Sequence, residues 1–138
     1  MVVVVVILLA TGSPILNRSI GGDDGLPMGT VLTWLAFICL PLVFLLGIPG
    51  LRHPKSKMQK WVRKAFGVLF GLGLLWGLIS YGLAANWNFN FKRQEAFRGS
   101  ARAGVLFWYL NYFLAIVPIM LVSFLGLEAI LKKLRRSK

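Results

Sequence analysis

The residues that could carry out acid–base, nucleophilic or metal chemistry are few in this sequence and lie far apart. The complete set of cysteine, histidine and acidic residues is Cys39, His53, Asp23, Asp24, Glu95 and Glu128. Zinc and iron–sulfur sites need clusters of cysteine or histidine, and a haem or chlorophyll held by histidine needs that residue within the membrane. An activated nucleophile needs a base within hydrogen-bond reach. We therefore predict no catalytic residue, no metal ligand and no cofactor-binding residue, and expect a protein that is not an enzyme.

The segments that surround these residues are strongly apolar. Of the 138 residues, 57% are hydrophobic and 14% are charged, and the mean hydropathy is +0.73. Soluble domains carry about 25% charged residues, and one membrane crossing needs about 20 apolar residues. Three segments meet that requirement without a charged residue or histidine inside them: 30–51, 65–85 and 103–127. The sequence predicts an all-α integral membrane bundle that forms a single membrane-embedded domain over residues 1–138.

The N-terminal segment 2–16 is apolar and rich in valine, but it is short for a crossing. It is compatible with a short fourth span or with an apolar arm packed against the bundle. We favour the fourth span.

The charge distribution predicts an orientation. The net charge is +12, and the basic residues concentrate in the loop 52–64 and the tail 128–138. Short cytoplasmic loops carry the excess of lysine and arginine. We therefore expect the C-terminus on the cytoplasmic or equivalent side of a bacterial inner membrane, an organelle inner membrane or a thylakoid membrane. Because the basic residues flank apolar blocks, we expect anionic lipids as partners and no nucleic acid.

The basic loop has an amphipathic pattern that suits a short interfacial helix on anionic headgroups. The predicted lipid contacts are Lys57, Lys60, Trp61, Arg63 and Lys64. Ordinary flanking charge, without a specific lipid, explains the same pattern.

The second predicted span has small residues on two faces. At about 100° per residue, the first set is Gly67, Gly71 and Gly82, and the roughly opposite set is Gly73, Gly77, Ser80 and Ala84. Small residues let helix backbones approach closely in lipid. We predict a central helix with neighbours on two sides, although glycine is frequent in membrane helices in general.

The third predicted span offers a matching face with Asn111, Ala115 and Pro118. Asn111 falls near the level of Ser80 if the two spans are antiparallel. We expect an Asn111–Ser80 hydrogen bond, with a contact to a quinone or pigment as the functional alternative.

The loop between these spans alternates amide and aromatic side chains. An aromatic belt at the membrane surface accounts for Trp87, Phe89 and Phe91. The alternative is a docking surface for a partner subunit, because exposed aromatic residues are enriched at interfaces.

These patterns favour a non-catalytic accessory or structural subunit of a larger membrane protein complex, such as a respiratory or photosynthetic electron-transfer assembly. It would act by helix packing and lipid contacts. The alternatives are a small homo-oligomeric channel or transporter component, and a membrane-protein assembly factor. A lipid or carotenoid held between helices by shape alone stays an open alternative, and no motif is specific enough to indicate a family.

Overall fold

The computed structural model describes residues 2–21, 25–86 and 97–136. Most of these residues are helical. Three helices are long and apolar enough to cross a membrane: α2 (Met28–Gly47), α4 (Lys57–Ala84) and α5 (Ala101–Arg136). By length and composition, the chain is a multi-pass membrane protein.

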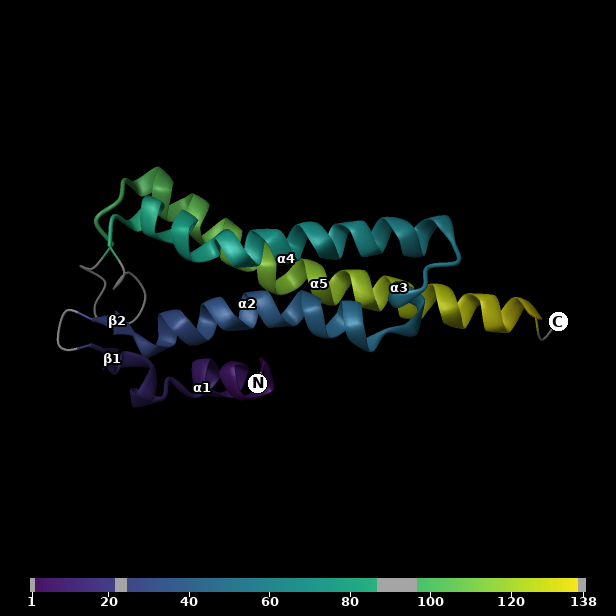
Figure 1. Ribbon diagram of the computed structural model, residues 1–138, viewed down its shortest axis with the longest axis horizontal. Helices are drawn as coiled ribbons and strands as arrows, with labels where there is room; N and C mark the ends of the chain where they lie inside the picture. The colour runs from purple at the N-terminus through teal and green to yellow at the C-terminus, as the bar shows by residue number, and fades with distance from the viewer. Residues whose placement is uncertain (1, 22–24, 87–96, 137–138) are drawn as a thin grey trace.

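The three long helices lie lengthwise beside one another, and successive ones run in opposite directions (Figure 1). The helix α4 packs against both α2 and α5, and it is therefore the central element. The C-terminal part of α5 extends beyond the ends of the other helices (Figure 1). Each helix covers most of its predicted span, but α4 and α5 run well past the apolar segments into the basic ones. Local hydropathy predicts only the part of a helix that lies within the bilayer, whereas the helix itself continues until a cap or a helix breaker ends it.

The N-terminal segment forms a short helix, α1 (Val2–Thr11), followed by a 3-10 turn, η1 (Pro14–Asn17). The helix α1 ends because Gly12 takes φ +59°, a left-handed conformation favourable to glycine at a helix end, and Ser13 donates its backbone N–H to the Leu8 carbonyl. Ten residues rise about 15 Å, half of the hydrocarbon thickness. The fourth span over residues 2–16 therefore stays a prediction, and α1 lies beside α2 (Figure 1).

A short antiparallel hairpin links this segment to α2. Its strands are β1 (Ser19–Ile20) and β2 (Leu26–Pro27), paired Ser19 with Pro27 and Ile20 with Leu26.

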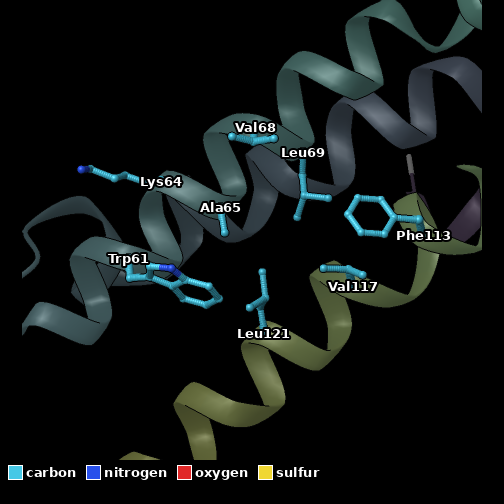
Figure 2. Close-up of a pocket in the computed structure, with 8 residues that line it drawn as sticks. All are labelled: Trp61, Lys64, Ala65, Val68, Leu69, Phe113, Val117 and Leu121. Carbon is cyan, nitrogen blue, oxygen red and sulfur yellow. The ribbon is translucent and has the colours of Figure 1, made fainter.

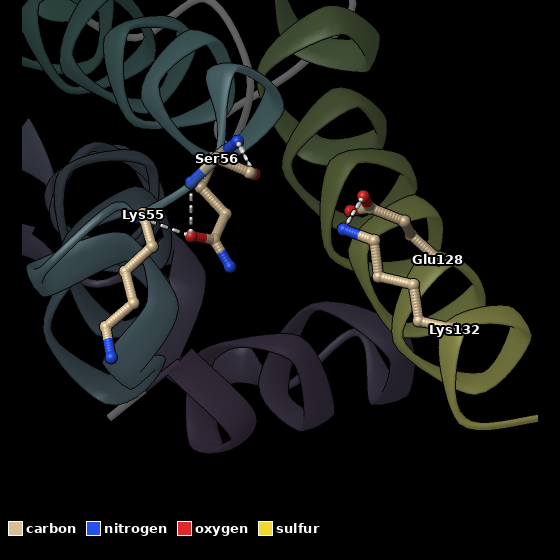
Figure 3. Close-up of polar contacts among 5 residues, drawn as sticks. Lys55, Ser56, Glu128 and Lys132 are labelled. Carbon is tan, nitrogen blue, oxygen red and sulfur yellow. Dashed lines mark hydrogen bonds and ion pairs between the residues drawn. The ribbon is translucent and has the colours of Figure 1, made fainter. Parts of the chain in front are cut away.

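The basic loop is largely helical. A short helix, α3 (Pro49–Arg52), follows α2, and α4 begins at Lys57 rather than at residue 65. A capping box sets this start: the Ser56 hydroxyl accepts a hydrogen bond from the Gln59 backbone at 3.1 Å, and Gln59 Oε1 accepts one from the Ser56 backbone at 3.2 Å. Figure 3 shows this cap beside the last turns of α5, where Glu128 and Lys132 form an ion pair. The start of α4 and the end of α5 thus lie at one end of the bundle, here called the basic end.

At the opposite end of the bundle, the backbone at residues 98–99 lies directly against the end of α4. The helix α4 ends at Ala84, and the next residue, Ala85, takes φ +57°. Arg98 donates its backbone N–H to the Ala84 carbonyl at 3.0 Å. A Cβ on Gly99 would collide with the Leu83 carbonyl oxygen. The chain therefore re-enters the bundle directly against the end of α4.

The core lies mainly along α4, between α2 and α5. The buried core includes three large side chains of α4, Val62, Phe66 and Trp76, together with Phe107 and Leu114 of α5. The Trp76 ring lies edge-on to Phe37 of α2, with centroids 5.4 Å apart. One residue of α4 therefore contacts both neighbouring helices.

Candidate functional site

A close contact between α2 and α4 uses two glycines of α4. A Cβ on Gly73 would lie 2.5 Å from the Phe37 carbonyl oxygen, and a Cβ on Gly77 would lie 2.6 Å from the Trp34 ring. Real Cβ contacts are essentially never that short. The helix α2 therefore occupies the glycine face formed by Gly73 and Gly77.

Trp34 also anchors this contact through its ring nitrogen. Its Nε1–H donates to the Gly73 carbonyl at 3.0 Å and to the Leu74 carbonyl at 3.1 Å. An indole N–H inside a membrane needs such an acceptor, because lipid chains offer none. The glycines allow the ring to approach closely enough to reach the α4 backbone.

The other predicted face of α4 has no such neighbour among the described residues. A Cβ added to Gly67, Gly71 or Gly82 would meet nothing within 4 Å. The two sets of small residues therefore have different surroundings. Gly73 and Gly77 contact α2, whereas a Cβ on Gly67, Gly71 or Gly82 would have no neighbour within 4 Å among the described residues.

Asn111 does not bond to Ser80, and that expectation is wrong. The Asn111 Oδ1 accepts a hydrogen bond from Trp76 Nε1 at 3.1 Å, and its Nδ2 donates to the Phe107 carbonyl at 2.7 Å. Ser80 is buried, but its hydroxyl has no hydrogen-bond partner among the described residues. The same is true of Thr33 on α2. The longer indole reaches the amide across the helix interface, one turn away from Ser80 along α4.

The remaining predicted packing residues of α5 lie along the same side as Asn111. Pro118 is fully buried, and Ala115 packs against the core at its edge. Both residues therefore lie on the buried side of α5 beyond Asn111.

Nearer the basic end, α4 and α5 diverge around an apolar groove of about 430 Å³. Its α4 wall is formed by Trp61, Lys64, Ala65, Val68 and Leu69, and its α5 wall by Phe113, Val117 and Leu121. Figure 2 shows these side chains on either side of an open space, with Lys64 extending away from its centre on the Trp61 side. Two predicted anionic-lipid residues, Trp61 and Lys64, therefore line this groove. Lys60 lies one turn before Lys64 on the same helix.

The predicted lipid residues do not all face the same surroundings. Arg63 donates from Nη1 to the Arg52 carbonyl at 3.1 Å, which ties the start of α4 to α3. Lys57, Lys60 and Lys64 are exposed. Their spacing of three and four residues places these lysines on one face of α4.

The outer face of α5 carries a group of exposed aromatic side chains. Trp108, Tyr109 and Tyr112 are 52%, 67% and 56% exposed. Trp108 stacks on Tyr112 with ring centroids 5.9 Å apart. This group is here called the aromatic face.

Trp34 and the aromatic face were not predicted from the sequence. A detectable signal existed for Trp34, because a tryptophan within an apolar span must find an acceptor for its N–H. For Trp108, Tyr109 and Tyr112, the signal was three large amphipathic residues close together near the start of the third span.

The predicted docking residues Trp87, Phe89 and Phe91 lie outside the described residues.

Within residues 2–21, 25–86 and 97–136, no three His, Cys, Asp or Glu side chains come together in a way that could hold a metal ion. Comparison with protein-family models, with curated proteins and with solved structures gave no match.

Proposed function

We propose that this chain is a non-catalytic accessory subunit of a larger membrane protein complex, and that it binds a neighbouring subunit through the aromatic face of α5. The observation that carries the proposal is the exposure of Trp108, Tyr109 and Tyr112 on one helix. Tryptophan and tyrosine supply large contact areas and are enriched where protein interfaces are energetically important.

The small buried fraction of α5 also supports a contact with a neighbouring subunit. Only 11% of its most apolar stretch is buried, against 28% for α2 and 33% for α4. Its buried positions follow a narrow stripe through Phe107, Asn111, Leu114 and Pro118. With respect to the residues that the structure describes, most of the circumference of α5 is therefore free to meet lipid or another subunit.

The position of the tyrosines favours a protein partner over lipid alone. Tyr112 lies eleven positions into α5, roughly 16 Å from its first residue by helix rise. If α5 enters the membrane where the apolar segment 103–127 begins, this hydroxyl would lie within the hydrocarbon layer even with the side chain directed back towards the helix start. A neighbouring subunit would supply an acceptor that lipid chains lack.

The orientation and setting belong to the same proposal. The basic end would face the cytoplasm, or the equivalent compartment of an organelle, because lysine and arginine concentrate there. A respiratory or photosynthetic electron-transfer complex is the first setting to test, with packing of helices and lipids as the role of this chain.

The experiment is to extract the native protein in mild detergent, separate it on a native gel and identify the accompanying chains by mass spectrometry. We expect a large particle with defined partner subunits. The double variant Trp108→Ala/Tyr112→Ala should migrate apart from that particle, whereas Val43→Ala/Leu46→Ala on the exposed side of α2 should remain in it. A small particle that contains only this chain would overturn the proposal and favour the homo-oligomeric alternative.

A further inference from the structure

We infer that the groove between α4 and α5 binds one anionic phospholipid, with an acyl chain in the groove and the phosphate at Lys64. This site does not depend on membership of a larger complex, because both of its walls belong to this chain.

The shape of the groove suits an acyl chain that enters from the basic end. Along α4 the groove runs from Trp61 to Leu69, and along α5 from Phe113 to Leu121. Each wall spans eight residue steps, about 12 Å by helix rise. One leaflet of the hydrocarbon core is about 15 Å deep. An acyl chain that starts at the membrane surface therefore follows the groove through most of one leaflet.

The chemistry of the walls changes along this path. Leu69, Val117 and Phe113 offer only apolar contact at the inner part (Figure 2). At the opposite part stand Trp61, an indole 62% exposed, and the Lys64 side chain. Tryptophan with an apolar ring and a polar N–H is typical of the membrane–water boundary. The groove therefore has an apolar inner part and a cationic mouth, which matches a lipid chain with its anionic headgroup.

Positive charge continues from the mouth along the same side of α4. Lys57, Lys60 and Lys64 are exposed on one face of the helix, and Figure 2 shows Lys64 directed away from the centre of the groove on the Trp61 side. Long lysine side chains extend in this way towards the headgroup level. The nearest described carboxylate, Glu128, is paired with Lys132 on α5. These lysines therefore favour an anionic headgroup over a zwitterionic one.

The test uses full-length protein that has been purified in detergent and depleted of lipid. Phosphatidylglycerol or phosphatidylcholine with identical acyl chains is added, and bound lipid is counted by native mass spectrometry. We expect one retained phosphatidylglycerol and a weaker phosphatidylcholine adduct. Lys64→Gln should reduce retention of phosphatidylglycerol about fivefold, the effect of one lysine near an anionic surface, and should leave phosphatidylcholine unchanged.

A second variant tests the groove itself. Ala65 faces the open space (Figure 2), so that Ala65→Trp would fill it and should remove the adduct of either lipid. Lys55→Gln, which removes the same charge from an exposed position of the basic end outside the groove, should behave like the wild type. Circular dichroism during heating shows whether each variant keeps its helices. If Ala65→Trp unfolds, the loss of phosphatidylglycerol from Lys64→Gln still tests the site.

Three results would overturn the inference. One is equal retention of the two lipids by the wild-type protein, and another is an unchanged adduct in folded Ala65→Trp. The third comes from native membranes: a photo-crosslinker placed at residue 117 should form an adduct with lipid, and an adduct with a protein or a co-purified carotenoid would assign the groove to that occupant instead.

Discussion

The two interfaces of α4 differ in how closely the helices approach each other. On the α2 side, Gly73 and Gly77 bring backbone and ring atoms together. On the α5 side, the contact is made by large side chains such as Trp76 and Phe107, with ring centroids 6.5 Å apart. The first interface leaves no room for a Cβ at either glycine, whereas the second leaves a groove of about 430 Å³ at the basic end. In lipid, where apolar burial drives association weakly, side-chain size decides whether two helices seal or leave room for a ligand.

The largest effect is expected from Gly73→Leu and Gly77→Leu. Each new side chain would displace α2, because the atoms it meets are the Phe37 carbonyl and the Trp34 ring. We expect each substitution to lower the free energy of unfolding by about 3 kcal/mol, the upper end for overpacking. Unfolding in mixed micelles titrated with dodecyl sulfate measures the change.

The matched controls for these substitutions are Gly67→Leu and Gly71→Leu on the open side of the same helix. Their free energy of unfolding should stay near that of the wild type. Equal destabilisation of both pairs would mean that the contact with α2 does not distinguish the two faces.

A smaller effect is expected from Asn111→Leu at the other interface. This change removes the acceptor of the Trp76 N–H bond between α4 and α5. A double-mutant cycle with Trp76→Phe should give a coupling energy of about 0.6 kcal/mol, and at most about 1.7 kcal/mol, as for other hydrogen bonds within membranes. If the effects of the two single substitutions on the free energy of unfolding are additive, the Trp76–Asn111 hydrogen bond is contradicted.

Trp34→Phe should have an effect of similar or smaller size. The ring would still pack against Gly77, but the hydrogen bonds to the Gly73 and Leu74 carbonyls would be lost. We expect a loss of about 0.5 kcal/mol, at the low end for a protein hydrogen bond, because α-helical carbonyls already accept a bond within their helix. A loss as large as that of Gly77→Leu would show that the hydrogen bonds, rather than the close approach, hold α2 in place.

The smallest effect is expected from Ser80→Ala. The Ser80 hydroxyl is buried without a hydrogen-bond partner among the described residues, and such a group opposes folding. Alanine should therefore leave the free energy of unfolding unchanged or raise it slightly. Ser123→Ala, at an exposed position of α5, is the control, and a clear loss for Ser80→Ala alone would reveal a partner for this hydroxyl.

The amino-acid sequence by itself determined where the long apolar helices lie. The spans predicted over 30–51, 65–85 and 103–127 overlap α2, α4 and α5, because twenty apolar residues in a row are a local property that needs no knowledge of neighbours. The small residues of α4 were also visible in the sequence as two faces of one helix. The extension of α4 back to Lys57 was less visible, because it depends on the Ser56–Gln59 cap rather than on hydropathy.

Only the tertiary structure decided which side chains meet. The partner of Asn111 is Trp76 rather than Ser80, and α2 lies on Gly73 and Gly77 while Gly67 and Gly71 stay open. Such choices depend on the rotation of each helix about its axis and on the axial offset between helices. Helical periodicity places residues on faces but leaves both of these quantities undetermined, and the packing of large rings such as Trp34 and Trp76 sets them.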